Sequence, residues 1–259
     1  MRTRDLRIKD LRAPSGAGMS RGIRLGVLTP SSNTALEPLT SALVAEVPGC
    51  SAHFSRFRVT EIALSAQALG QFDDSSILAA AELLADAKVD VIAWSGTSSG
   101  WLGFDADRRL VEGIKARTGI PATTAVMALN ELLVLRGIGK LGLVTPYTAD
   151  VQERIVRNYE ALGIQVVAER HFGIRVNYDF ALVEPDRLQA SMEEVAAAGP
   201  DAIATFCTNL RAAPLAAGFE ARTGVPLLDT VSTTVWGALR AIGEDPQRLR
   251  NWGQFFAWR

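Results

Sequence analysis

The chain carries one series of motifs twice. Residues 24–30 (RLGVLTP) are echoed by residues 140–146 (KLGLVTP), Asp90 by Asp201, and residues 116–121 (ARTGIP) by residues 221–226 (ARTGVP). In chain order, the offsets are 116, 111 and 105 residues (140 − 24, 201 − 90 and 221 − 116). Three matches in the same order, at shortening offsets, indicate two copies of one unit whose loops differ in length.

Each copy alternates short apolar runs with helical patterns. In the first copy we predict strands at residues 24–29, 52–59, 89–94 and 121–124, and helices after residue 34 and at 75–87, 107–117 and 126–136. Such alternation is typical of a parallel sheet covered by helices on both faces. The predicted fold class is therefore α/β, with two pseudo-symmetric, internally duplicated domains that each contain a parallel sheet flanked by helices.

The duplication also suggests domain boundaries. We predict a first domain at 22–137, completed by the C-terminal segment 236–259, and a second domain at 138–235. Residues 1–21 read as a disordered or frayed N-terminal extension, in which Met19 is an alternative start to Met1. Ligands of open parallel sheets bind beyond the carboxyl ends of the strands. The active site is thus expected in the inter-domain cleft, where loops 30–34, 95–100, 146–148 and 207–209 converge.

Composition excludes several classes of partner. Hydrophobic residues make up 48% of the 259 residues and charged residues 21%, with a net charge of −1 and no basic block, so neither nucleic acid nor a membrane surface is implied. From its two cysteines and two histidines we expect no usual structural zinc site, and we expect no metal and no cofactor. With no signal-peptide pattern and no apolar run long enough to cross a membrane, we predict a reduced, cytoplasmic protein. An aromatic-rich C-terminal end leaves homo-oligomerisation open.

The stretch at residues 201–211 (DAIATFCTNLR) carries the main candidate for chemistry. Its apolar run ends at Cys207, which predicts a buried strand that delivers a thiol to the N-terminus of a following helix. There the helix dipole would lower the thiol pKa and make it a proton donor and acceptor. The alternative is a small buried apolar residue. Cys207 lies six residues after Asp201, and the residue six after Asp90 in the first copy is Gly96. Only the second half therefore presents a thiol at this position.

The loop at residues 95–100 (SGTSSG) offers hydroxyls and backbone N–H groups that would bind a carboxylate or an oxyanion. An ordinary solvated turn is the alternative. The loop also matches G-x-S-x-G, but a hydrolase of that type needs a histidine near the chain end. The chain has only His53 and His171, so a serine hydrolase is disfavoured.

Polar side chains also stand at other strand tips. Asn33 and Tyr147 occupy corresponding positions in the two copies, and both can donate to a carboxylate. Either could instead be a turn residue, Asn33 especially. Asn177 follows another predicted strand.

Taken together, residues 24–243 resemble the aspartate/glutamate racemase superfamily, specifically its maleate isomerase and arylmalonate decarboxylase branch. Residues 30–34 (PSSNT), followed by Glu37, resemble the opening motif of maleate isomerases, in which the asparagine binds a substrate carboxylate. Residues 145–154 (TPYTADVQER) are similar to the tyrosine segment of both enzymes, and Cys207 matches the second-half cysteine that both use. The Asn177 segment resembles the isomerases. The resemblance implies cofactor-free chemistry.

The chain departs from the isomerases at Gly96. Isomerases carry a cysteine there, whereas arylmalonate decarboxylase carries glycine followed by Thr-Ser, as here. By this comparison Cys207 is catalytic, and the residues expected to hold a carboxylate or an enediolate are Gly96, Thr97, Ser98, Tyr147 and Thr208. The residues expected to bind the substrate elsewhere are Ser32, Asn33 and Asn177.

One thiol restricts the mechanism. Racemisation and cis–trans isomerisation need groups on both faces of the substrate, whereas decarboxylation of a malonate-type acid needs one proton donor. We therefore expect a cofactor-independent decarboxylase acting on a small carboxylate or dicarboxylate, and the two amides Asn33 and Asn177 argue against an aryl substituent. The alternatives are a maleate isomerase-like enzyme or racemase and, more remotely, a non-catalytic carboxylate binder.

Overall fold

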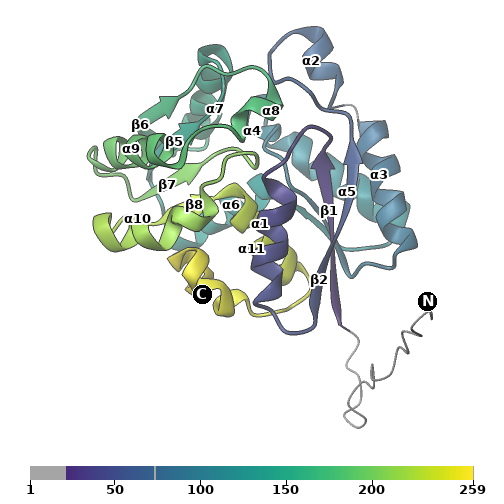
Figure 1. The fold of residues 1–259 in the computed structure, drawn as a ribbon. Coiled ribbons are helices and arrows are strands. Elements are labelled where there is room, and N and C mark those ends of the chain that lie inside the picture. Colours follow the sequence, from purple (N-terminus) through teal and green to yellow (C-terminus); the bar gives the residue numbers. More distant parts are fainter. Residues whose placement is uncertain (1–21, 73, 259) are drawn as a thin grey trace, which may run out of the picture.

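The computed structural model describes residues 22–72 and 74–258 and contains two four-stranded parallel sheets (Figure 1). Their strand orders, β2-β1-β3-β4 and β6-β5-β7-β8, are the same arrangement repeated. This confirms the predicted α/β class and the duplication. The predicted N-terminal extension at 1–21 lies outside the described residues, and the exact domain boundaries stay a prediction.

The first half follows the predicted alternation to within a few residues. Its elements are β1 (Ile23–Pro30), α1 (Leu36–Ala45), β2 (Cys50–Phe57), α2 (Ala66–Gly70), α3 (Asp74–Asp86), β3 (Val91–Trp94), α4 (Ser99–Leu102), α5 (Asp105–Thr118), β4 (Ala122–Thr124) and α6 (Ala125–Arg136). The short helices α2 and α4 were not predicted, because four or five residues are too few to show a helical period.

The second half repeats this order and ends in irregular helical turns. Its elements are β5 (Lys140–Thr145), α7 (Ala149–Ala161), β6 (Gln165–His171), α8 (Asn177–Phe180), α9 (Pro185–Ala196), β7 (Ala202–Thr205), the 3₁₀ helix η1 (Ala213–Leu215), α10 (Ala216–Thr223), β8 (Leu227–Asp229), α11 (Thr230–Ala241) and the 3₁₀ helices η2 (Pro246–Trp252) and η3 (Gln254–Ala257).

The repeated ARTG motif ends a helix in each half. Gly119 closes α5 and Gly224 closes α10, both with left-handed φ angles (70° and 71°), and their N–H groups bond back to Lys115 and Glu220. Glycine adopts this conformation without the steric cost that a Cβ brings. The chain therefore turns at once into the last strand of each sheet, β4 or β8.

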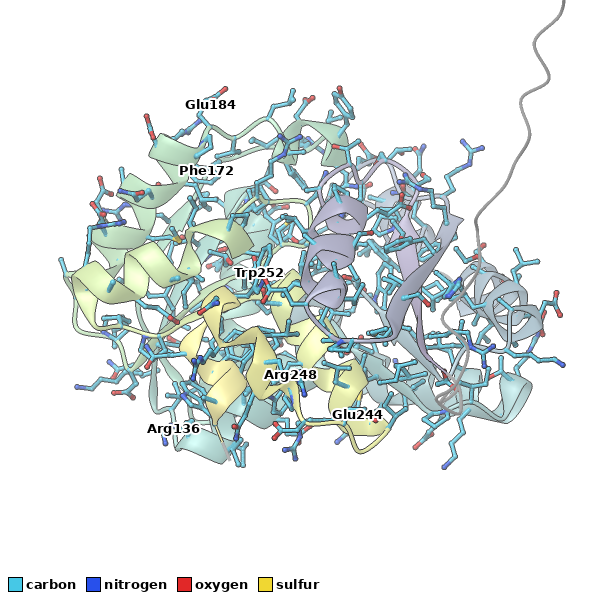
Figure 2. The ribbon with its side chains drawn as sticks, turned by 60° about the horizontal axis from the view of Figure 1, so that its bottom comes forward. Arg136, Phe172, Glu184, Glu244, Arg248 and Trp252 are labelled. Carbon is cyan, nitrogen blue, oxygen red and sulfur yellow. The ribbon has the colours of Figure 1, made fainter. Side chains whose placement is uncertain are left out.

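The C-terminal part of the chain joins the two halves. Helix α11 packs against β3, β4, α1 and α6, so it covers the first sheet although it follows the second (Figure 1). Beyond it, η2 and η3 pack on α10 and β8. Trp252 of η2 is labelled in Figure 2, and its indole N–H donates to the Glu46 carboxylate, at the end of α1, over 2.6 Å. No helix in the described ranges is both long and apolar enough to span a membrane.

Candidate active site

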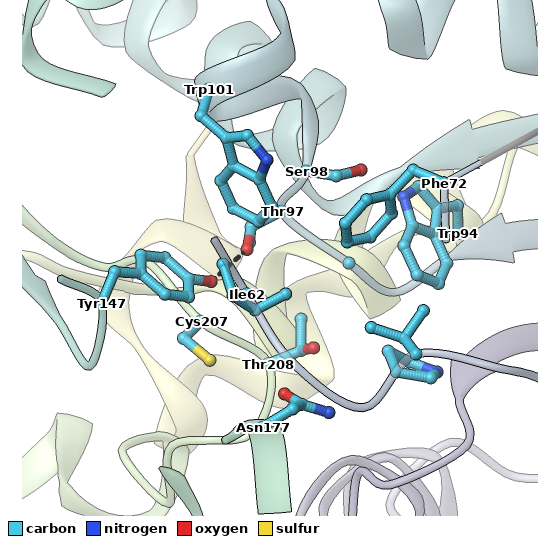
Figure 3. A pocket seen from close by; sticks show the side chains of 13 residues that line it. Ile62, Phe72, Trp94, Thr97, Ser98, Trp101, Tyr147, Asn177, Cys207 and Thr208 are labelled. Carbon is cyan, nitrogen blue, oxygen red and sulfur yellow. Dashed lines mark hydrogen bonds between the residues drawn. The ribbon is translucent and has the colours of Figure 1, made fainter. Parts of the chain in front are cut away.

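A small cavity lies where the carboxyl ends of the two sheets meet (Figure 3). Its free volume is about 20 Å³, little more than the space that one water occupies. Both halves contribute to its wall. The lining residues are Pro30, Val59, Ile62, Phe72, Trp94, Gly96, Thr97, Ser98, Trp101, Tyr147, Asn177, Cys207 and Thr208.

Cys207 lies two residues beyond β7 and is only 3% exposed. Burial raises the pKa of its thiol to about 12, although hydrogen bonds from the backbone of Asn209 and from Tyr147 oppose this. The prediction of a lowered pKa was wrong for two physical reasons. Neighbouring elements exclude water from the thiol, and residues 208–210 form a turn, so no helix begins there. The thiol is consequently protonated at neutral pH.

Two hydroxyls face each other beside the thiol. The oxygens of Thr97 and Tyr147 are 2.6 Å apart (Figure 3). Burial raises the pKa of Tyr147 well above its ordinary value, so the phenol keeps its proton. Ser98 also lines the cavity, and its hydroxyl has no hydrogen-bond partner among the described residues. These groups form a set of neutral donors of the kind that stabilises an oxyanion.

Buried carboxyl groups hold the loops that carry these residues. Asp107 accepts hydrogen bonds from the Ser99 hydroxyl (2.8 Å) and from the Thr124 hydroxyl. Asp229 accepts from the Thr205 hydroxyl and from two backbone N–H groups of α11, each at 3.0 Å. Burial raises the pKa of both carboxyls to about 6. This pair was not predicted from the sequence, because only burial distinguishes Asp107 and Asp229 from the other acidic residues.

The three residues predicted to bind substrate elsewhere differ in position. Asn177 lines the cavity, and its side-chain N–H donates to the Ser32 hydroxyl (2.8 Å). Asn33 instead accepts from the N–H groups of Ala35 and Leu36 at the start of α1 and donates to Thr208 over 3.3 Å. Ser32 and Asn33 therefore support the wall from behind, and direct contact of either with substrate stays a prediction.

A short backbone bridge joins the two halves beside the cavity. Glu61 and Val176 form an isolated antiparallel pair. The Ile62 N–H donates to the Arg175 carbonyl (2.9 Å), and the Asn177 N–H donates to the Thr60 carbonyl (3.0 Å). A ligand larger than a water exceeds the free volume of the cavity, so part of its lining must move to admit one.

The position opposite the thiol is occupied by an aromatic ring. A Cβ built on Gly96 would lie 2.0 Å from Cζ2 of Trp94 and 2.4 Å from Cε2. Contacts under 3.0 Å are essentially never seen for a real Cβ. Gly96 is thus the residue that the packing of Trp94 requires.

Most of the apolar wall was not foreseen from the sequence. Six lining residues are apolar side chains, namely Pro30, Val59, Ile62, Phe72, Trp94 and Trp101. Pro30 belongs to loop 30–34, which was expected at the cleft, and Trp94 had a sequence signal because the second copy has Thr205 in its place; the other four had none. Neither His53, beside Ser51, nor His171, beside Glu169, lines the cavity, which leaves Ser98 without the base that a serine hydrolase needs.

No cluster of metal-ligating side chains was found in the part of the chain that the structure describes. The reactive groups at this site are a thiol, hydroxyls and amides.

Comparison with known proteins gives concordant results. A family model described as arylmalonate decarboxylase matches residues 27–256. The chain is 26% identical to the maleate isomerase of Pseudomonas putida over 240 residues, which cover 88% of this chain and 95% of the relative. It is 27% identical to the arylmalonate decarboxylase of Bordetella bronchiseptica over 169 residues, or 64% and 70% of the two chains. A crystal structure of a Pseudomonas putida maleate isomerase with maleate superposes with a TM-score of 0.83 at 25% identity, covering 91% of this chain and 98% of that one.

Proposed function

Because this chain belongs to the arylmalonate decarboxylase family, a branch of the Asp/Glu racemase-like superfamily, we propose that it is a cofactor-independent decarboxylase of substituted malonates. One observation carries the proposal. Of the described residues that line the cavity, only Cys207 has a thiol, and it faces neutral hydroxyl donors rather than a second thiol or a base. That set suits a reaction with a single proton transfer to carbon.

In the proposed reaction, one carboxylate of the malonate accepts hydrogen bonds from Thr97, Ser98 and Tyr147. The bond between the central carbon and the other carboxylate breaks, CO₂ leaves, and the electron pair delocalises into the retained carboxylate as an enediolate. The hydroxyl donors stabilise the charge that develops on its oxygens. Cys207 then transfers its proton to the central carbon, and the thiolate regains a proton from solvent. The raised pKa of Cys207 supports this role, because the thiol is protonated before each turnover.

The lining also supports a class of substrate. The leaving carboxylate would lie among apolar side chains such as Val59, Ile62 and Phe72, where loss of hydration favours departure of neutral CO₂. The same apolar wall favours an apolar or aryl substituent on the central carbon. This replaces the expectation of a polar second group, which rested on Asn33 and Asn177 together, because Asn33 is occupied at the start of α1.

Maleate cis–trans isomerisation is the second candidate function. The identity to the Pseudomonas putida maleate isomerase, over 95% of that protein, favours it. The absence of a thiol at Gly96 weighs against it, since Cys207 would then have to serve both faces of the substrate.

The deciding experiment incubates the protein in D₂O with 2-aryl and 2-alkyl malonates and with maleate, followed by NMR. We expect loss of CO₂ with one deuterium placed on the central carbon, and no product from the Cys207→Ala variant. A Cys50→Ala variant is the matched control, because Cys50 lies at the start of β2 outside the cavity lining. Conversion of maleate to its trans isomer, without loss of CO₂ from any malonate, would overturn the proposal in favour of the isomerase.

A further inference from the structure

The two halves differ by a paired exchange of large and small residues. The offset of 111 residues between Asp90 and Asp201 also relates Trp94 to Thr205 and Gly96 to Cys207. The second half thus has a small side chain followed by a thiol. At the corresponding positions the first half has the Trp94 indole followed by Gly96, which has no side chain. We infer that Trp94 is a specificity-determining residue: it fills the place of a first-half thiol and restricts proton transfer to the Cys207 face of the substrate. This inference rests on the proposed function.

The indole is held in place by its surroundings. Trp94 is 1% exposed, and its ring packs against Phe57 with the centroids 5.0 Å apart. Its backbone lies in the sheet, paired with Leu28 of β1 and Thr124 of β4. A side chain so enclosed moves only if its neighbours move too. A Cβ or Sγ at residue 96 therefore meets a fixed ring.

The ring also lies on the far side of the cavity from the thiol. In Figure 3, Trp94 and Cys207 stand at opposite sides of the lining, and Thr97 and Tyr147 lie on the side of Cys207. An enediolate held by Thr97 and Tyr147 would present one face to Cys207 and the other to the indole. An indole offers no proton to carbon at neutral pH, since its carbon-bound hydrogens do not exchange and its N–H is a very weak acid, and the buried ring separates this face from bulk solvent. Protonation is thus confined to one face, which gives one enantiomer.

The stereochemical test uses a 2-methyl-2-arylmalonate, whose decarboxylation product has a stereocentre. We expect the natural chain to give one enantiomer, Trp94→Phe to retain most of that preference, and Trp94→Leu to give a product with much lower enantiomeric excess. The Phe variant is the matched control, because it keeps an aromatic ring at the position. Unchanged enantiomeric excess in Trp94→Leu would overturn the inference.

A second arm restores a thiol to the first half. Gly96→Cys alone is expected to exchange the α-hydrogen of the product acid for deuterium no faster than the natural chain. Gly96→Cys combined with Trp94→Leu is expected to exchange it at least ~10²-fold faster, which is the usual contribution of a positioned acid or base. Equal rates for the single and double variants would show that Trp94 does not block the position.

A third arm does not depend on the substrate. Gly96→Ala is expected to lower the melting temperature by on the order of 5 °C, from the cost of overpacking a core. The double variant Gly96→Ala/Trp94→Leu should have a higher melting temperature than the sum of the decreases in the two single variants predicts. Gly70→Ala is the matched control, because a Cβ there meets nothing within 4 Å. If Gly96→Ala melts like Gly70→Ala, the steric inference is wrong.

The arms separate two failures. If the natural chain decarboxylates no malonate while Gly96 and Trp94 couple in the melting experiment, the proposed function is wrong and the stereochemical role fails with it, but the steric block stands. If decarboxylation occurs and the coupling is absent, the proposed function stands and the role of Trp94 is overturned.

Discussion

Removing one hydroxyl from the cavity tests whether it stabilises a negative charge. In Tyr147→Phe the ring stays in its packed position against Trp101 and Phe180, and only the phenol oxygen, 2.6 Å from the Thr97 hydroxyl, is lost. Loss of one oxyanion donor typically lowers kcat by about 10²–10³, or about 2.7–4 kcal/mol of transition-state stabilisation. The Thr97 hydroxyl, which is buried, also loses its partner, at about 1–3 kcal/mol of folding stability. At about 2–4 °C per kcal/mol, the melting temperature should fall by several degrees.

The chain provides a matched control for this experiment. Tyr159 is also fully buried, but its hydroxyl has no hydrogen-bond partner among the described residues and lies outside the cavity lining. Tyr159→Phe should therefore leave kcat unchanged and melt at the same temperature or higher, because it removes an unsatisfied polar group.

The assay is steady-state decarboxylation of an aryl malonate, with thermal unfolding measured on the same preparations. A kcat for Tyr147→Phe within about threefold of the natural chain would refute the charge-stabilising role, because loss of such a donor typically lowers kcat by about 10²–10³. Equal losses in Tyr147→Phe and Tyr159→Phe would refute it too, because they would assign the effect to packing.

Three further predictions follow from the same site. Cys207→Ala should abolish turnover yet still bind a malonate, as measured by calorimetry, because the hydroxyl donors remain; loss of binding together with turnover would contradict the role of a proton donor alone. Asp107 and Asp229 have folded-state pKa values of about 6, above the ordinary 3.8, so their contribution to stability is fully present below about pH 4 and is lost as the pH rises through 6. The free energy of unfolding of Asp107→Asn, measured in urea, should therefore fall less between pH 4 and 6 than that of the natural chain, by at most about 3 kcal/mol. If the free energies of the two proteins differ by the same amount across that range, the carboxyl is not protonated on folding. Ser99→Ala should lower kcat by less than Tyr147→Phe does, because Ser99 only ties its loop to Asp107. If kcat, measured separately for the two variants on one substrate, falls further in Ser99→Ala, Ser99 has a direct role.

The sheets could be predicted because their signals are local and occur twice. Apolar runs indicate the strands, and the ARTG glycines mark the helix ends. The same pattern recurs in the second copy, which supports the assignment made in the first. The same reasoning led from Gly96 and Cys207 to the cleft, and the structure brings Thr97, Ser98, Tyr147, Asn177 and Thr208 to the cavity with them.

The remaining features of the site depend on contacts between distant segments. Residues 59–72 have no clear period, and contacts with distant segments place them in the cavity wall, among them the bridge from Glu61 to Val176 and the packing of Phe72 on Trp101. The pKa of Cys207 depends on how completely both halves exclude water. Asn33 had two interpretations from sequence, a carboxylate donor and a turn residue. Its side-chain oxygen accepts from the N–H groups of Ala35 and Leu36, as in a turn, and its contact with a carboxylate stays a prediction. The helix expected directly after Cys207 begins only at Ala213, where η1 leads into α10, so the thiol does not lie at its N-terminus.

Helix α11 places a constraint on how the molecule is made. It covers the first sheet, and residues 230–239 are buried there. During synthesis, β3 and β4 leave the ribosome more than a hundred residues before the helix that shields them, at a translation rate of about 5–20 residues per second. The first half must therefore wait several seconds with part of its apolar surface uncovered, exposed to chaperones and to aggregation. The apolar core of the first half is therefore completed only after α11, near the end of the chain, has been synthesised.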